Sequence, residues 1–256
     1  GSLAPWASVD GSMDRIADGS PFMAIPVSEL APAYSANNPF PHLVLRNIWD
    51  EAMLSRVSVE CDAFTDWDEE KAFYGSVGKR VCGTFSKLPL HTAKLISYCN
   101  GSKFLTLLEG LTGEVGLIPD PHLFGGGIHS TINQGFLKMH ADFNWHNHLK
   151  LYRRLNLLIY LNKNWREEWG GELLLARRNE SCLNAEVSVA PCFNTTVIFT
   201  TTDHSFHGHP EPMRLPEGQA RNSIALYYYV AEKPDGTSDL RRTMTDYRRG
   251  DGQPYV

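Results

Sequence analysis

The sequence predicts an α+β protein that is mainly β, with its helices ahead of its strands. After Gly113, short segments rich in Ile, Leu, Val, Thr, Phe and Tyr follow one another, separated by Gly, Pro, Asn and Asp. Many short strands with such punctuation are typical of a β-sandwich or β-barrel. Before Gly113, apolar residues recur three and four positions apart, which is the spacing of a helix buried on one face.

Length and composition exclude several classes of protein. The 256 residues are 42% hydrophobic and 21% charged, which favours one globular structural domain. No apolar run approaches the roughly 18 to 20 residues that cross a bilayer, so no membrane association is expected. The net charge of −5 disfavours a protein that binds nucleic acid through its phosphates. Five scattered cysteines without a C-x-x-C pair predict reduced thiols rather than a zinc or disulfide framework.

The first residues lack the basic-then-apolar pattern of an export signal. Residues 1–12 are interpreted as vector-derived, with Met13 as the expected native start, and a cytoplasmic protein is predicted. Residues 13–124 are expected to be an N-terminal lead-in segment followed by helices that support the strand-rich core. Within them, residues 13–40 are rich in Pro, Ser and Ala and are expected to be irregular.

The supporting elements follow this lead-in. Residues 39–48 contain a short apolar run that predicts a strand. Asp50 is placed to cap a helix that runs to about Phe64. From Leu90 to Leu111 the helical spacing predicts two helices, broken at Asn100-Gly101.

The strand-rich core is predicted over residues 125–231. The polar residues 232–256 that follow are expected to be a solvated tail that partly folds over the domain. The predicted strands of the core are GGGIHSTI (125–132), FLKMHADF (136–143), RLNLLIYLN (154–162), GELLLA (171–176), AEVSVA (185–190), TTVIFT (195–200) and NSIALYYYV (222–230).

Two groups of histidines are candidates for metal ligands. His140 and Asp142 are two residues apart in a predicted strand, so both side chains can point to one target. A third ligand from the second group, which contains His204, His207 and His209, would complete two imidazoles and one carboxylate. Such a facial set leaves open positions and suits Fe(II). An H-x-D pair alone is weak evidence, because any half-buried strand can contain one by chance.

An arginine opens the last apolar strand. The guanidinium of Arg221 can bind a carboxylate through two parallel hydrogen bonds, and Ser223 shares its face and adds a hydroxyl. A dicarboxylate could chelate a metal with one end and bind this pair with the other. The alternative is a structural Arg–Asp pair at a sheet edge.

Taken in order, these motifs resemble a known family. The series GGG-x-H, H-x-D-F-N, R-x-L-N-L-L-I-Y-L-N-x-x-W, W-G-G-E-L, F-H-G-H-P-x-P and R-x-S-I-A-L-Y-Y-Y is similar to that of the 2-oxoglutarate and Fe(II)-dependent dioxygenases, in their prolyl 4-hydroxylase-like branch. The resemblance covers residues 125–231 and is co-linear. It implies a double-stranded β-helix (jelly roll) with the metal at its open end, supported by helices outside the barrel.

The resemblance also implies a metal-ligand set. His140 and Asp142 correspond to the proximal iron ligands and His207 to the distal one. His207 is preferred to His209 because the family's distal histidine comes just after the turn that follows TTVIFTTT. Related halogenases have a small residue at the position of Asp142, so a carboxylate there implies hydroxylation.

The same correspondence assigns a co-substrate pocket. Arg221 becomes the partner of the C5 carboxylate of 2-oxoglutarate, assisted by Ser223 and by the hydroxyl of Tyr160. His146 and His148 are expected on the surface or in a substrate loop. The further candidates for lining the pocket or contacting substrate are His129, Asn144, Asn156 and His209.

The implied activity is a hydroxylation that depends on Fe(II), 2-oxoglutarate and O₂. An unactivated C–H bond of a small molecule, amino acid or short peptide would be hydroxylated with release of succinate and CO₂, and ascorbate is a candidate accessory reductant. The compact length favours such substrates over the alternative, a peptidyl-prolyl hydroxylase acting on a protein. A cupin-type metal hydrolase or isomerase would not need Arg221 with Ser223. A non-catalytic jelly-roll binding protein would not need three metal ligands.

Overall fold

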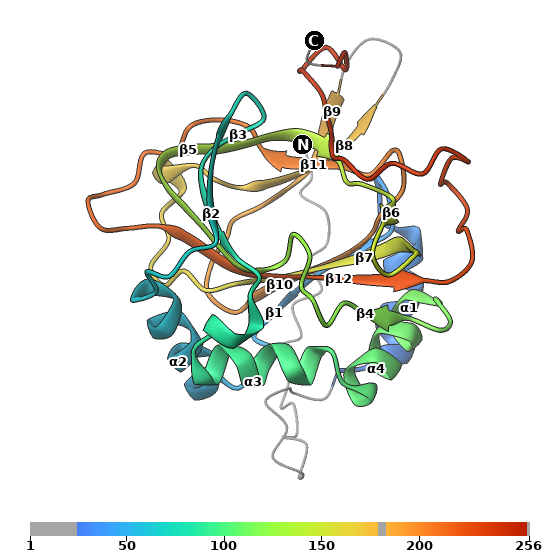
Figure 1. Cartoon of the computed structure of the whole chain (residues 1–256), viewed down its shortest axis with the longest axis horizontal. Helices are drawn as coiled ribbons and strands as arrows, with labels where there is room; N and C mark the ends of the chain where they lie inside the picture. Colours follow the sequence, from blue (N-terminus) through green and yellow to red (C-terminus); the bar gives the residue numbers. More distant parts are fainter. Residues whose placement is uncertain (1–24, 179–182, 255–256) are drawn as a thin grey trace.

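A strongly curved antiparallel sheet forms the body of the protein, and helices pack against its outer face (Figure 1). The computed structural model describes residues 25–178 and 183–254. The predicted vector-derived residues 1–12 and the expected start at Met13 lie outside this part of the chain. The helices of the described residues are α1 (Val27–Ala36), α2 (Glu51–Asp62), α3 (Leu90–Cys99) and α4 (Ser102–Thr112), with short 3-10 turns η1 (Phe85–Lys87) and η2 (Glu167–Trp169).

The strands pair in the order β1-β10-β7-β12-β5-β11-β8-β9. The hairpin of β2 and β3 lies beside β5, and three two-residue strands pair with β12, β7 and β5. This curled, mainly β architecture is the double-stranded β-helix that the motifs predicted. The strands are β1 (His42–Arg46), β2 (Glu69–Phe73), β3 (Ser76–Cys82), β4 (Ile118–Pro119), β5 (Gly127–Ala141), β6 (Trp145–His146), β7 (Leu151–Tyr160), β8 (Leu173–Arg178), β9 (Leu183–Val189), β10 (Thr195–Thr200), β11 (Phe206–His209), β12 (Arg221–Val230) and β13 (Asp246–Tyr247).

The core segment predicted as two strands, 125–132 and 136–143, is one long strand, β5. The expected break at residues 133–135 is a bend inside the strand, where Gln134 has a φ of 63°. The first part of β5 pairs with β12 and its last part with β11, while β3 pairs along both parts. Pairing with β3 on both sides of this bend therefore keeps the two parts in one strand, although the register shifts between Val77 and Lys79 of β3.

The predicted supporting helices α2 to α4 are present, but the start of the region and the β2–β3 hairpin were not predicted. The Asp50 side chain caps α2 by accepting a hydrogen bond from the Met53 amide at 2.9 Å, and α3 and α4 are separated at Asn100 and Gly101. The expectation that residues 13–40 are irregular is wrong for α1. This helix forms because it buries Leu30 and Tyr34.

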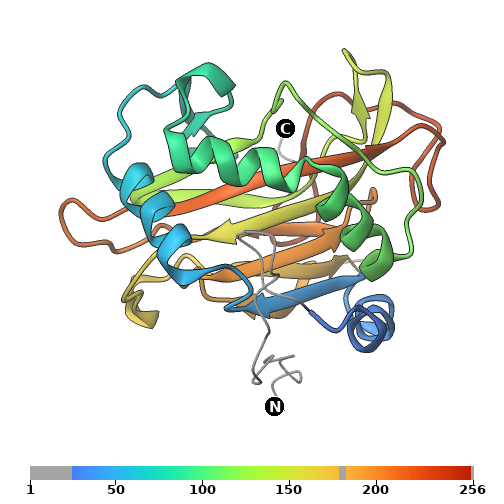
Figure 2. The same ribbon diagram turned by 90° about the horizontal axis from the view of Figure 1, so that it is seen from below.

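The main apolar core lies between the helices and the outer face of the sheet. Helix α3 crosses β12 on this face (Figure 2), where the hydroxyl of Tyr228 donates to the carbonyl of Cys99 at 2.9 Å. Along β7, Leu155, Leu157 and Ile159 join this core. The alternate residues Asn156, Leu158 and Tyr160 therefore point into the barrel, because successive side chains of a strand face opposite sides.

Two further observations concern the chain as a whole. No helix of the described residues is long and apolar enough to cross a bilayer. The cysteines described, Cys61, Cys82, Cys99 and Cys192, are free thiols rather than disulfides.

Candidate active site

A cavity of about 520 Å³ opens into the barrel and brings most of the predicted site residues together. Its walls come from β5, β7, β11 and β12, from the β2–β3 hairpin and from the C-terminal residues 243–247. Neither the hairpin nor the C-terminal residues were predicted to lie at the site. The cavity therefore combines segments that lie far apart in sequence, from Glu69 to Tyr247.

Three predicted metal ligands meet in this cavity. His140 lies near the end of β5, Asp142 directly follows it, and His207 lies on β11 opposite His140. One ligand atom from each side chain lies within 4.8 Å of the other two. The Asp142 carboxylate oxygens are 3.6 Å from Nε2 of His140 and 3.5 Å from Nε2 of His207. Two imidazoles and one carboxylate converging in this way fit a divalent transition metal such as Fe(II).

Backbone carbonyls fix the orientation of both imidazoles. His140 Nδ1 lies 2.7 Å from the carbonyl oxygen of Lys138, and His207 Nδ1 lies 3.0 Å from that of Ser205. With the proton on Nδ1, each Nε2 keeps its lone pair for a ligand. Burial lowers the pKa of His207 to about 3, so this imidazole is neutral at pH 7. A neutral imidazole is the form that binds a metal.

Arg153 and Asn156 hold the Asp142 carboxylate in place. Arg153 Nη2 lies 3.1 Å from Asp142 Oδ2, and Asn156 Nδ2 donates to the same oxygen at 2.7 Å. The guanidinium also donates to Asn156 Oδ1 and lies 3.5 Å from the centre of the Tyr227 ring. Although burial raises the pKa of Asp142, the charge of Arg153 holds it well below its usual range. Asn156 thus lines the cavity as predicted, whereas the role of Arg153 was missed.

Arg221 is buried at the other end of the cavity. Its Nε donates to the carbonyl of Gly171 at 2.7 Å, and Nη2 donates to the Tyr160 hydroxyl at 3.2 Å. Ser223 lies opposite Tyr160 on one side and opposite His129 on the other. Among the described residues no carboxylate forms an ion pair with Arg221, so the alternative of a structural Arg–Asp pair is not what the structure shows. A buried guanidinium without a counter-ion is costly, which favours an anionic ligand here.

Two of the remaining candidates line the cavity. His129 Nε2 lies 2.9 Å from the carbonyl oxygen of Gly125, and burial, together with the charge of Lys79, holds the pKa of this histidine well below its usual range. His209 also lines the cavity and is not part of the metal-ligand cluster. Its buried Nδ1 has no hydrogen-bond partner among the described residues.

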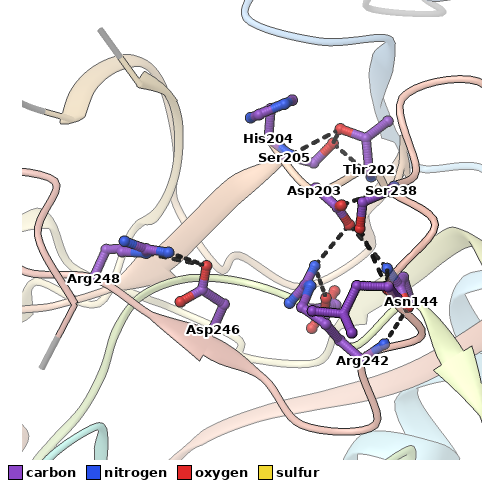
Figure 3. A network of polar contacts seen from close by, with 11 residues as sticks. Asn144, Thr202, Asp203, His204, Ser205, Ser238, Arg242, Asp246 and Arg248 are labelled. Atoms are coloured by element: carbon purple, nitrogen blue, oxygen red, sulfur yellow. Dashed lines mark hydrogen bonds and ion pairs between the residues drawn. The ribbon is translucent and has the colours of Figure 1, made fainter. Parts of the chain in front are cut away.

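Two other expectations are wrong. Asn144 does not line the cavity, because its amide is bound to Asp203 and to the backbone of Arg242 in a separate polar cluster (Figure 3). His146 is not a surface residue: its Nε2 lies 3.1 Å from a carboxylate oxygen of Asp120, and both side chains are buried. His148 is exposed, as expected.

Lys79 of β3 is a cavity residue that the sequence did not reveal. It lies opposite Thr131 of β5, which in turn lies opposite Arg221, so the three residues form one row across the strands. Burial and the charge of Lys71 lower the pKa of Lys79 to about 7. Strand β2 is almost entirely exposed, so the hairpin has no apolar pattern that would have predicted it.

Comparisons with known proteins agree with this fold. Residues 126–229 match the family model described as the 2OG-Fe(II) oxygenase superfamily. No curated protein sequence matches the chain significantly.

Solved structures with the same fold include two prolyl hydroxylases and a protein with small-molecule ligands bound. A Trichoplax adhaerens prolyl hydroxylase, in complex with a hypoxia inducible factor peptide, is 18% identical over 79% of this chain and 89% of its own, with a TM-score of 0.57. A Pseudomonas putida prolyl-4-hydroxylase is 12% identical over 79% and 98%, with a TM-score of 0.52. HygX from Streptomyces hygroscopicus, with nickel, 2-oxoglutarate and hygromycin B bound, is 13% identical over 84% and 88%, with a TM-score of 0.51.

Proposed function

We propose that the chain, whose residues 126–229 match the family model of the 2OG-Fe(II) oxygenase superfamily, is a hydroxylase dependent on Fe(II), 2-oxoglutarate and O₂. The substrate is a small molecule, an amino acid or a short peptide, and succinate and CO₂ are released. One observation carries the proposal. A cluster of two imidazoles and one carboxylate shares a cavity with a buried arginine that has no carboxylate partner among the described residues.

The chain's own residues would bind the metal and keep it in place. His140, Asp142 and His207 would hold Fe(II), which, with 2-oxoglutarate and O₂, supplies the oxidising power for breaking a C–H bond. The carbonyls at Nδ1 keep the two imidazoles in the tautomer that binds a metal. Arg153 and Asn156 keep the Asp142 carboxylate ionised and fix its direction.

Arg221, Tyr160 and Ser223 would bind the distal carboxylate of 2-oxoglutarate. All three side chains are buried, so water is largely excluded and a charge-assisted hydrogen bond is strong. The Gly171 carbonyl holds Nε of the guanidinium, which leaves its remaining N–H groups for a carboxylate. A cupin-type hydrolase or isomerase, or a sugar- or peptide-binding jelly roll, gives no reason for this arginine beside a metal-ligand cluster.

The substrate class is open between two kinds of molecule. The relatives with this fold are described with a peptide in one case and with hygromycin B in another. A protein-directed peptidyl-prolyl hydroxylase is therefore the second candidate, favoured by the two prolyl hydroxylases among the similar structures. A screen of free amino acids, prolyl peptides and small secondary metabolites therefore includes substrates for both candidate functions.

The test is a turnover screen with the metal content controlled. The protein is loaded with Fe(II) without oxygen, then given 2-oxoglutarate, O₂ and one compound at a time, with and without ascorbate. The expected result is succinate release that requires both metal and 2-oxoglutarate, with a mass gain of one oxygen in one compound class. His140→Ala serves as the control and is expected to lose the activity. A wild type that binds neither Co(II) nor 2-oxoglutarate, and that releases no succinate, would contradict the proposal.

A further inference from the structure

The C-terminal residues 243–247 lie inside the site although they follow the barrel in sequence. Thr243, Met244, Thr245 and Tyr247 line the same cavity as the metal-ligand cluster. Strand β13 pairs with the end of β5, with Tyr247 opposite His140. The Tyr247 ring lies 5.2 Å from the imidazole of His140, measured between ring centres. The segment therefore lies at the metal end of the cavity.

This position separates the segment from the co-substrate end. The co-substrate end is marked by the hydroxyl of Tyr160 on β7, which lies beside Arg221 of β12. Tyr247 instead contacts Phe73 and Tyr74 of the β2–β3 hairpin. The centre of the Tyr247 ring lies 5.4 Å from that of Phe73 and 6.1 Å from that of Tyr74. A molecule that approaches the metal from the hairpin side would therefore meet residues 243–247.

A polar cluster, which we call the Asp203 cluster, fixes the start of this segment. It consists of Asn144, Asp203, Ser238 and Arg242, and Figure 3 shows these side chains pointing toward one another. Asp203 accepts from Arg242 Nη2 at 2.8 Å, from Asn144 Nδ2 at 3.1 Å and from the Ser238 amide at 2.9 Å. Although burial raises the pKa of Asp203, Arg242 and Ser238 lower it to about 2. The carboxylate is thus fully ionised at neutral pH.

Arg242 connects this cluster to the metal-ligand cluster. The same Nη2 that binds Asp203 also donates to the backbone carbonyl of Asp142 at 3.2 Å. Asn144, two residues after Asp142, accepts from the Arg242 amide at 2.7 Å, and the amides of Asn144 and Trp145 donate to the Arg242 carbonyl. The C-terminal segment is therefore bonded to the stretch of chain that carries Asp142 through both side chain and backbone.

We infer that residues 243–247 form one wall of the substrate-binding site, and that the Asp203 cluster positions this wall relative to Asp142. The inference rests on the proposed function, because it takes the His140–Asp142–His207 cluster as the metal site. The wall presents two threonine hydroxyls, a thioether and a phenol ring. Its one charged residue, Asp246, is bound to Arg248 at 2.7 Å. Such a surface suits an uncharged part of a substrate that has hydrogen-bonding groups beside an apolar face.

Asp203→Asn tests the positioning role. The variant keeps the shape of the side chain and removes its charge. Arg249→Met is the control, since Arg249 is exposed, lies two residues after the 243–247 segment and does not line the cavity. Hydrogen exchange is measured in the metal-free protein. In Asp203→Asn, the amide of Arg248, which donates to the carbonyl of Met139 on β5, is expected to exchange about ten- to a hundredfold faster, because a charge-assisted tether is lost. Unchanged exchange in Asp203→Asn would overturn the positioning role.

Binding and turnover test the wall itself. Calorimetry on Co(II)-loaded protein should give the same affinity for 2-oxoglutarate, within about twofold, in wild type, Asp203→Asn and Thr245→Val. With the compound turned over best in the screen, Asp203→Asn and Thr245→Val are expected to raise its KM about tenfold and to leave the co-substrate KM unchanged. An unchanged KM for that compound in both variants would overturn the substrate wall. If the wild type binds no metal and turns over nothing, the proposed function fails together with the substrate role, while the exchange data still decide the positioning role.

Discussion

Replacing Arg221 by lysine is expected to weaken the binding of 2-oxoglutarate and to leave metal binding unchanged. The substitution keeps the positive charge but removes the planar fork of the guanidinium. In the structure the fork is already divided between partners, since Nε donates to the Gly171 carbonyl and Nη2 to the Tyr160 hydroxyl. The remaining N–H groups are the ones that would bind a carboxylate through two bonds. A lysine has one nitrogen at the end of its chain and cannot serve all of these partners.

The expected magnitude follows from the loss of one charge-assisted hydrogen bond in a buried place. Such a bond is worth about 1.5–3 kcal/mol. At about 1.4 kcal/mol for each factor of ten, the co-substrate KM should rise roughly ten- to a hundredfold. Iron binding should not change, because Arg221 is not a member of the metal-ligand cluster.

The assay is a titration of wild type and Arg221→Lys with 2-oxoglutarate, with iron content measured in both. Arg214→Lys is the matched control, because Arg214 is exposed on the loop before β12. 2-Oxobutanoate, which lacks the distal carboxylate, should be used equally poorly by wild type and variant. An unchanged co-substrate KM would mean that Arg221 is only structural, and the assignment of the co-substrate pocket would be wrong.

Three further predictions concern the metal and the buried charges of the cavity. His207→Ala should lose Co(II) binding whereas His209→Ala should keep it, because only His207 belongs to the ligand cluster; metal analysis giving the reverse would exchange their roles. Asp142→Ala should lower the free energy of unfolding of the metal-free protein by about 3–5 kcal/mol, since Arg153 would stay buried without its partner. The double variant Asp142→Ala/Arg153→Met should recover most of this loss, as measured by urea denaturation. Because the pKa of Lys79 is about 7 in the native protein and near its ordinary value when unfolded, the unfolded chain binds more protons above pH 7. Stability should therefore rise with pH from about 7 to 10, and denaturation of Lys79→Met across this range should show a smaller rise.

Local patterns determined the strand content and the identity of the candidate ligands. An H-x-D pair points two side chains to one face of any strand, so the convergence of His140 and Asp142 needs no information from elsewhere in the chain. The alternation in β7 likewise sends Asn156 and Tyr160 to one side and Leu157 and Ile159 to the other. In each case the alternation of side chains along one strand, with one apolar face buried, is enough to decide the direction of each side chain.

Other features depended on a partner far away in sequence. His146 carries no sign in its own segment that it will be buried, because the carboxylate that satisfies it belongs to Asp120. Asn144 lies beside the metal-ligand cluster in sequence, yet Arg242 and Asp203 draw its amide away from the cavity. For a polar side chain, the hydrogen-bond partner decides whether burial is tolerated.

The sequence by itself determined the fold class, the order of the motifs, and the residues that can hold a metal and a dicarboxylate. Only the tertiary structure decided that Arg153 secures Asp142, that Lys79 shares a row with Arg221, and that residues of the segment 243–247 line the cavity beside His140. The exposed strand β2 and the polar C-terminal segment bury little apolar surface of their own, so no periodic pattern records where they lie. Strand β2 is positioned by pairing with β3, which itself pairs with β5. The C-terminal segment is positioned by pairing with β5 and by hydrogen bonds to residues about forty to one hundred positions away in sequence, which no local pattern contains.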